Sequence, residues 1–323
     1  MKAVITAKNK LESIYKKFPR LVGYAGKLVF TLISLFLLRS NCGYNELLSN
    51  AWTVVLISIF CAFAPARFLV LILLVYALVQ FYTLSLGVGV ICTAIIMAVY
   101  LIYFRFDTSY VYLVFLIPVL SMARLPLLLV LILAVTGSFD MLILIIFGNL
   151  IYYMIRYVNL NAAVISGMTD QSEYAKMTLA AKGIFTNTEF LYTVVIFIVV
   201  FLLVHYMKKI NINQANNLSI AAGSGMYIIL SLIANLIFET LTVNRLINII
   251  VGAVIAALAA AIIVYAVLPL DYTRLETFEF EDDEYHYYVR AIPKVVISRE
   301  SVRVKKINTR KEINTGKAKE KEH

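Results

Sequence analysis

Five polar residues lie within or beside long apolar stretches and could bind a substrate or an ion: Arg67, Arg124, Asp140, Asn149 and Gln80. Such groups are costly in hydrocarbon, and they commonly face a bundle interior or a water-filled cavity. A guanidinium group matches the planar geometry of a carboxylate or phosphate, so the two arginines could bind an anionic substrate or headgroup. The carboxylate of Asp140 could bind a cation or proton where a helix breaks. We therefore take these five residues as a candidate path for a substrate or ion.

Each of these residues also has a structural interpretation. Arg67 and Arg124 lie at proline-marked joints, where arginine can anchor a turn at the membrane interface. Ser138 could cap a helix whose positive end would favour Asp140. Asparagines such as Asn149 commonly form hydrogen bonds between membrane helices. The sequence leaves the structural and the functional interpretation open.

The surrounding sequence is too apolar for a water-soluble domain. Hydrophobic residues make up 62% and charged residues 15% of the 323 residues, and the mean hydropathy is +0.86, whereas a soluble domain carries about 25% charged residues. The apolar runs are continuous rather than alternating, which favours helices over the strands of a barrel. We predict an all-α integral membrane protein, a polytopic helical bundle with its transmembrane domain over residues 21–269. The apolar segments are 21–38, 51–63, 68–83, 84–104, 109–122, 125–136, 139–155, 190–207, 218–238 and 246–269.

Some of these segments are short for a membrane crossing. Segments 51–63, 109–122 and 125–136 hold 13, 14 and 12 residues. That is about 20 Å of helix against a hydrocarbon core of about 30 Å. Local thinning of the bilayer would permit ten crossings. Alternatively, residues 51–83 and 109–136 are two re-entrant hairpins in opposite orientations, a build common in secondary transporters. We therefore predict eight to ten membrane segments.

Basic residues predict the orientation in the membrane. Residues 1–27 hold seven Lys/Arg and one acidic residue, and positive charge beside a span favours the cytoplasmic side. Both models have an even number of crossings, so we predict a multi-pass protein of the cell membrane with both termini in the cytoplasm. Residues 1–20 would form a basic amphipathic segment there. The net charge of +10 fits attraction to lipid headgroups, and no nucleic-acid-binding module accompanies it.

The chain changes character after Pro269. Residues 270–297 form an acidic and aromatic juxtamembrane segment that favours a small β-hairpin with an acidic turn. Its edge could dock a cytosolic or membrane protein partner, or could clasp the protein's own loops. Residues 298–323 are basic and have the composition of a disordered tail. The candidate partner-binding residues are Tyr285, Tyr287, Tyr288, Asp282 and Asp283.

No motif indicates enzymatic chemistry. The sequence contains neither Gly-x4-Gly-Lys-Ser/Thr nor His-Glu-x-x-His, and its three cysteines lack the spacing of metal ligands. We therefore expect no catalytic activity, no cofactor and no metal, with the lipid bilayer as the main partner. The leading hypothesis is a transporter or permease-like subunit. The alternative is a membrane scaffold that recruits partners through its C-terminal tail.

Overall fold

The computed structural model describes residues 17–103, 111–168, 172–210, 214–267, 276–281 and 286–291. The side chains of residues 66–67, 102–103 and 111–112, and nearly all of those in the last two segments, lie outside the described part. The chain forms two compact units, Met1–Pro269 and Leu270–His323. We describe each unit by itself.

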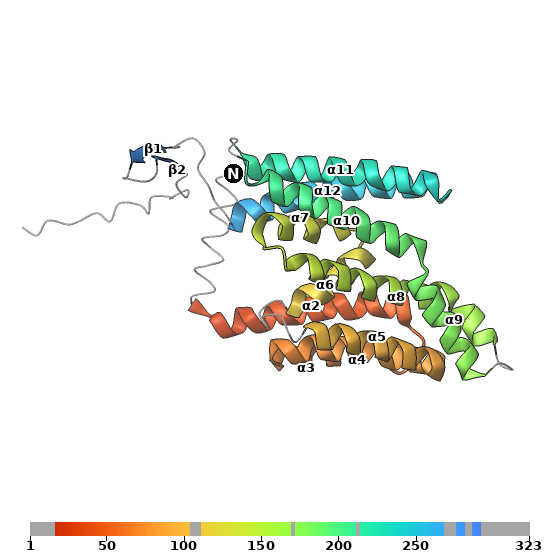
Figure 1. Ribbon diagram of the computed structural model, residues 1–323. Helices are drawn as coiled ribbons and strands as arrows, with labels where there is room; N and C mark the ends of the chain where they lie inside the picture. Colours follow the sequence, from red (N-terminus) through yellow and green to blue (C-terminus); the bar gives the residue numbers. More distant parts are fainter. Residues whose placement is uncertain are drawn as a thin grey trace, which may run out of the picture. The chain divides into compact units, whose positions relative to one another are not determined.

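The described part of the first unit is helical (Figure 1). Its helices are α2 (Pro19–Cys42), α3 (Ala51–Phe63), α4 (Ala66–Leu84), α5 (Leu86–Tyr103), α6 (Val111–Met122), α7 (Pro126–Thr136), α8 (Met141–Gly167), α9 (Glu173–Phe185), α10 (Thr188–Met207), α11 (Ala215–Ile237) and α12 (Val243–Val267).

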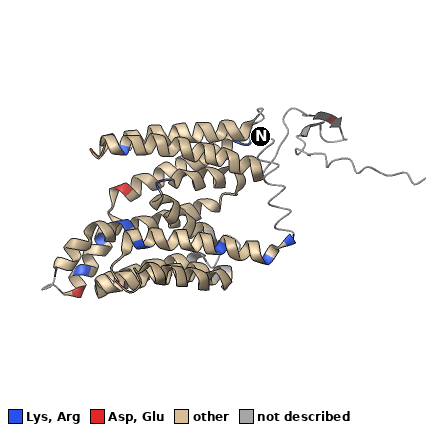
Figure 2. Ribbon diagram, turned by 180° about the vertical axis from the view of Figure 1, so that it is seen from behind, with Lys and Arg blue, Asp and Glu red and all other residues tan. Residues whose placement is uncertain are grey.

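These helices confirm the predicted multi-pass membrane bundle. Five stretches are long and apolar enough to cross a membrane, namely α2, α8, the continuous stretch of α9 and α10, α11 and α12. The shorter helices α3 to α7 are also apolar. Large apolar side chains point outward, as Trp52 and Val243 do, each with 76% of its surface exposed. Lipid must cover such side chains, and most of each ribbon carries no charge (Figure 2).

The two ends of α10 serve to name the two ends of this bundle. The Glu189 end is the end at which α10 begins, and the Lys208 end is the end at which it finishes. α2 begins and α12 finishes at the Lys208 end, to the left in Figure 1. The first and the last described helix of this unit therefore begin and finish, respectively, at the same end of the bundle.

Helices α3 and α4 form a hairpin that opens at the Glu189 end. The turn between them lies beside the first part of α2, where Lys27 Nζ donates a hydrogen bond of 2.8 Å to the Ala64 carbonyl. α4 then returns to the loop that precedes α3, where the Asn45 amide donates to Gln80 Oε1 at 2.6 Å. Lys27 is eight residues beyond the start of α2, and Tyr24, whose ring packs against that of Phe63, is five residues beyond it. The turn therefore lies about 7–12 Å inside that end of α2.

Helices α6 and α7 form a second hairpin, which opens at the Lys208 end. Lys208 Nζ donates to the carbonyls of Val135 and Gly137, at 2.9 and 3.1 Å, where α7 finishes. The turn of this hairpin approaches Asn248, which is five residues beyond the start of α12. The backbone of the turn reaches further, because a Cβ atom added to Gly252 of α12 would lie 3.1 Å from the Arg124 carbonyl oxygen. Gly252 is nine residues beyond the start of α12, so the turn ends about 13 Å inside the Glu189 end. The two hairpins open at opposite ends and both turn inside the bundle, which is the geometry expected of re-entrant hairpins.

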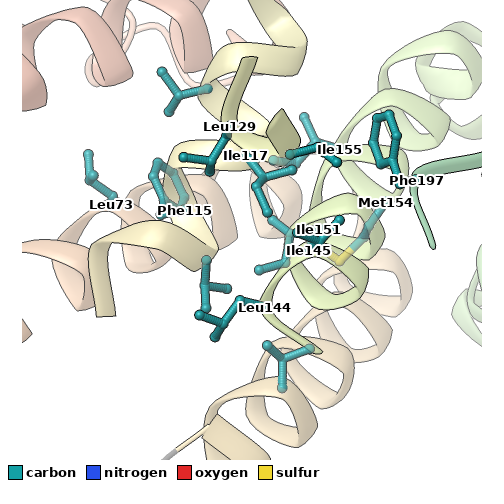
Figure 3. Packing of buried hydrophobic residues seen from close by; sticks show 14 of the residues in the cluster. Leu73, Phe115, Ile117, Leu129, Leu144, Ile145, Ile151, Met154, Ile155 and Phe197 are labelled. Atoms are coloured by element: carbon teal, nitrogen blue, oxygen red, sulfur yellow. The ribbon is translucent and has the colours of Figure 1, made fainter. Parts of the chain in front are cut away.

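Helices α6 and α8 pack closely at the centre of the first unit (Figure 3). Phe115 and Ile117 of α6 and Ile145 of α8 are almost fully buried there. A Cβ atom added to Gly148 of α8 would lie 2.7 Å from the Cβ atom of Ile117. The absence of a side chain at Gly148 therefore permits the close approach, as small residues commonly do between membrane helices.

Helix α9 lies at the Glu189 end and packs against α5 and α8. The Glu173 carboxylate in its first turn accepts hydrogen bonds from Lys176 Nζ (2.8 Å), Ser85 Oγ (2.6 Å) and the Gly87 amide (2.7 Å). One ionised carboxylate thus attaches α9 to the joint between α4 and α5.

In the second unit the described residues form two paired strands, β1 (Glu276–Glu281) and β2 (His286–Ala291). The strands are antiparallel, with Phe278 opposite Val289 and Phe280 opposite Tyr287. Both strands lie within residues 270–297, the segment for which the sequence favours a small β-hairpin.

Candidate functional site

A polar pocket of about 530 Å³ lies toward the Glu189 end of the first unit. Its wall includes the end of α2, the turn between α6 and α7, the middle of α8, the start of α10, the end of α11 and the start of α12. We call it the arginine pocket. Its charged lining residues are Arg124, Arg156, Glu189 and Arg245.

Glu189 joins three helices inside the arginine pocket. Its Oε2 atom lies 3.0 Å from Nη2 of Arg156 on α8, and its Oε1 atom accepts a hydrogen bond from Arg245 on α12. Arg245 also donates to Asn235 Oδ1 of α11 at 3.1 Å. The lining of the arginine pocket thus holds three guanidinium groups and one carboxylate, a net charge of +2. Such a site attracts anions.

Arg124 occupies the turn of the second hairpin in a left-handed backbone conformation, with φ of 63°. The Arg124 amide donates to the Ser121 carbonyl at 3.0 Å and the Leu125 amide to the Leu120 carbonyl at 2.8 Å. These two bonds form a Schellman motif, in which glycine usually takes the left-handed position. The guanidinium donates one long hydrogen bond, 3.5 Å, to Asn248 Oδ1. No acidic residue of the described part pairs with it.

Two buried polar atoms in the same wall have no hydrogen-bond partner within the described part of the chain. They are Nδ2 of Asn149 and Oγ of Ser121. The two residues are 1% and 6% exposed, respectively, and both line the arginine pocket. A buried polar group without a partner costs about 1–3 kcal/mol. Water or a bound ligand would remove that cost.

The structure brings together two of the five residues predicted for a substrate or ion path. Arg124 and Asn149 line the arginine pocket. Gln80 is fully buried elsewhere and bonds to the loop between α2 and α3. Asp140 is an exposed N-cap residue at the start of α8 and makes no side-chain capping hydrogen bond. The side chain of Arg67 lies outside the described residues, so its place on a path stays a prediction.

Two of the five predicted partner-binding residues lie in the described hairpin of the second unit. Tyr287 and Tyr288 belong to β2, opposite Phe280 and Glu279. Their side chains lie outside the described part. Docking through this segment stays a prediction. The other predicted residues, Tyr285, Asp282 and Asp283, lie wholly outside the described part.

Sequence reasoning missed the ion cluster of the arginine pocket. None of Arg156, Glu189 and Arg245 is among the residues predicted for a site, yet Glu189 of α10 pairs with both arginines. A signal was present, because Arg156, Glu189 and Arg245 each directly adjoin a predicted apolar segment at the same end. That pattern indicates a shared end of the bundle, whereas the contact between them depends on how the helices pack.

The fold and the pocket define a multi-pass membrane protein with a charged internal site. Comparisons of the chain with protein-family models, curated proteins and solved structures find no match.

Proposed function

We propose that this multi-pass membrane protein is a transporter or a permease-like subunit that holds its solute in the arginine pocket. The observation that carries the proposal is the position of the pocket against the turn of a hairpin that ends inside the bundle. In secondary transporters, binding sites commonly lie beside interrupted helices near the middle of the membrane. The α6–α7 hairpin would separate the pocket from the Lys208 end.

The distribution of basic residues supports one orientation. Residues 1–27, which lead into and begin α2, hold seven Lys/Arg, and Lys208 and Lys209 follow α10, so nine basic residues belong to the Lys208 end. Six belong to the Glu189 end, namely Arg39, Arg124, Arg156, Lys176, Lys182 and Arg245. Under the positive-inside rule, the Lys208 end would be cytoplasmic. Both ends of the membrane unit would then face the cytoplasm of the cell membrane, and the arginine pocket would lie toward the opposite side.

Cysteine labelling tests this proposal without knowledge of the solute. Met122, in the pocket wall, is replaced by cysteine and treated with a membrane-impermeant maleimide in right-side-out and in inside-out vesicles. A transporter exposes its site to each side in turn, so M122C should react in both preparations. Glu46→Cys and Ser138→Cys mark the Glu189 end and the Lys208 end, and each should react in only one. The unaltered chain, whose cysteines are buried, gives the background. Labelling of M122C from one side alone would count against transport.

A scaffold is the second candidate function, and the paired strands β1 and β2 favour it. A β-hairpin outside the membrane unit could bind a partner strand or an aromatic-binding groove. The test compares the full chain with a chain that lacks residues 277–323 in a pull-down from solubilised membranes. Loss of specific partners from the shortened chain would support the scaffold, and retention of every partner would exclude this route.

A further inference from the structure

We propose that the arginine pocket binds an oxyanion group, a carboxylate or a phosphate, with Arg124 as the principal contact. The group could belong to a soluble solute or to a lipid headgroup. This inference rests on the proposed function, because it gives the chemical class of the solute of the proposed transporter. The binding itself can be measured without transport.

Glu189 shows that the geometry of the pocket suits an oxyanion. Its carboxylate lies between Arg156 and Arg245, each of which contacts one of its two oxygens. Charge-assisted hydrogen bonds of this kind are among the strongest in proteins. Arg124 lines the same pocket, and no carboxylate of the described part pairs with it. The third guanidinium therefore remains for an anion from outside the chain.

The backbone conformation of Arg124 supports a role of its side chain in binding rather than in the stability of the fold. A left-handed conformation at a residue other than glycine costs about 1–2 kcal/mol, and Arg124 accepts this cost with φ of 63°. Glycine would complete the same Schellman motif without that cost. The guanidinium itself contributes little to the fold, because its one described hydrogen bond is long and exposed. Such outliers are commonly retained at binding sites.

The rest of the wall fits a small solute. The volume of about 530 Å³ lies within the range of about 300–1,000 Å³ that is typical of small-molecule sites. Asn149 Nδ2 and Ser121 Oγ could donate to further oxygens of the ligand. Tyr152, Tyr192 and Tyr227 also line the pocket, and their rings offer apolar surface to the carbon skeleton.

The proposal is tested by equilibrium binding to the full chain in phosphatidylcholine nanodiscs. Succinate and inorganic phosphate are titrated by calorimetry into the unaltered protein, Arg124→Gly and Arg39→Gln. Arg39 lies near the same end but outside the pocket, so R39Q controls for the loss of one charge. At least one anion should bind to the unaltered protein, at least about tenfold more weakly to R124G and unchanged to R39Q. Because glycine favours the turn, R124G should unfold at the same temperature as the unaltered protein or higher.

A second arm distinguishes a solute from a lipid. Nanodiscs that contain phosphatidylglycerol are compared with phosphatidylcholine nanodiscs by thermal unfolding. Stabilisation by phosphatidylglycerol in the unaltered protein and in R39Q, but not in R124G, would assign the oxyanion to a lipid headgroup. The inference is overturned if neither the soluble anions nor the anionic lipid show dependence on Arg124, or if R39Q weakens binding as much as R124G does.

The binding and labelling experiments together distinguish a failure of this inference from a failure of the proposed function. Binding that depends on Arg124, together with labelling of M122C from one side only, would retain the anion site and exclude transport. Labelling of M122C from both sides without anion binding would retain transport and exclude the oxyanion.

Discussion

Arg245, at the start of α12, binds Glu189 at the start of α10, 56 residues earlier in the chain. The same carboxylate also binds Arg156 of α8, so one acidic side chain connects three helices. Its side chain is 20% exposed, which limits screening by solvent. The contact organises the arginine pocket, and its removal should affect both the fold and the binding of anions.

Replacing Glu189 by Gln should lower the free energy of unfolding by about 1–3 kcal/mol, because two arginines lose their charged partner in a partly buried site. It should also strengthen succinate or phosphate binding, because a competing negative charge is removed. Thermal unfolding and calorimetry in nanodiscs measure the two effects. Glu46→Gln removes an exposed carboxylate from the loop after α2 and should change neither. Weaker anion binding by E189Q would contradict the arrangement described above.

Glu173→Gln should loosen the attachment of α9 to α5. The substitution removes the ion pair with Lys176 and the charge that strengthens the hydrogen bonds from Ser85 Oγ and the Gly87 amide. The variant should therefore unfold at a lower temperature than the unaltered protein and show faster amide hydrogen exchange in α9. Glu46→Gln, which removes an exposed carboxylate, is the control. Equal exchange in α9 for the two variants would show that the Glu173 carboxylate does not hold α9.

Lys208 should stabilise the end of α7. Its ammonium group donates to the carbonyls of Val135 and Gly137, which no following turn of α7 can satisfy. Lys208→Met should lower the free energy of unfolding by about 1–3 kcal/mol and speed amide hydrogen exchange at the end of α7. Lys209→Met is the matched control, because Lys209 is exposed and lies over the rings of Phe139 and Tyr206. Equal effects of the two substitutions would argue against a specific role for the Lys208 bonds.

Gly148→Ala should separate α6 from α8. The added Cβ would lie 2.7 Å from Ile117 Cβ and 2.8 Å from the Val114 carbonyl oxygen, and overpacking of this kind costs about 1–3 kcal/mol. Gly225→Ala in α11 meets no atom within 4 Å and should be neutral or stabilising. Thermal unfolding of both variants gives the comparison. A G148A variant as stable as G225A would mean that α6 and α8 adjust to the larger side chain.

The sequence predicted the short helices closely because their boundaries carry local signals. Asn50 caps α3 through its side chain, and a proline begins α7, so the predicted segments 51–63 and 125–136 nearly coincide with these helices. The predicted segment 139–155 stops too early, because α8 continues to Gly167. The apolar pattern ends at Arg156, but the helix continues, and the charge of Arg156 is paired with Glu189 inside the bundle. Hydropathy cannot reveal a partner that lies elsewhere in the fold.

The arginine pocket was only partly predictable for the same reason. Arg124 and Asn149 were recognisable as polar residues in apolar surroundings. Their position in one pocket depends on the depth at which the α6–α7 turn ends beside α12. Segment lengths alone fit either a crossing or a re-entrant hairpin, and they cannot fix that depth.

The contacts of Glu189 with Arg156 and Arg245 also bear on assembly, because the ribosome synthesises α8, α10 and α12 in that order. Arg156 and Glu189 are already present in the nascent chain when α10 enters the bilayer, whereas Arg245 arrives only with α12. A ribosome-released fragment that stops after α11 would leave Glu189 paired with Arg156 alone and would expose the face of α7 that α12 covers. Cellular quality control can recognise such unmatched surfaces, so premature termination between α11 and α12 should yield a rapidly degraded product rather than a partly working one.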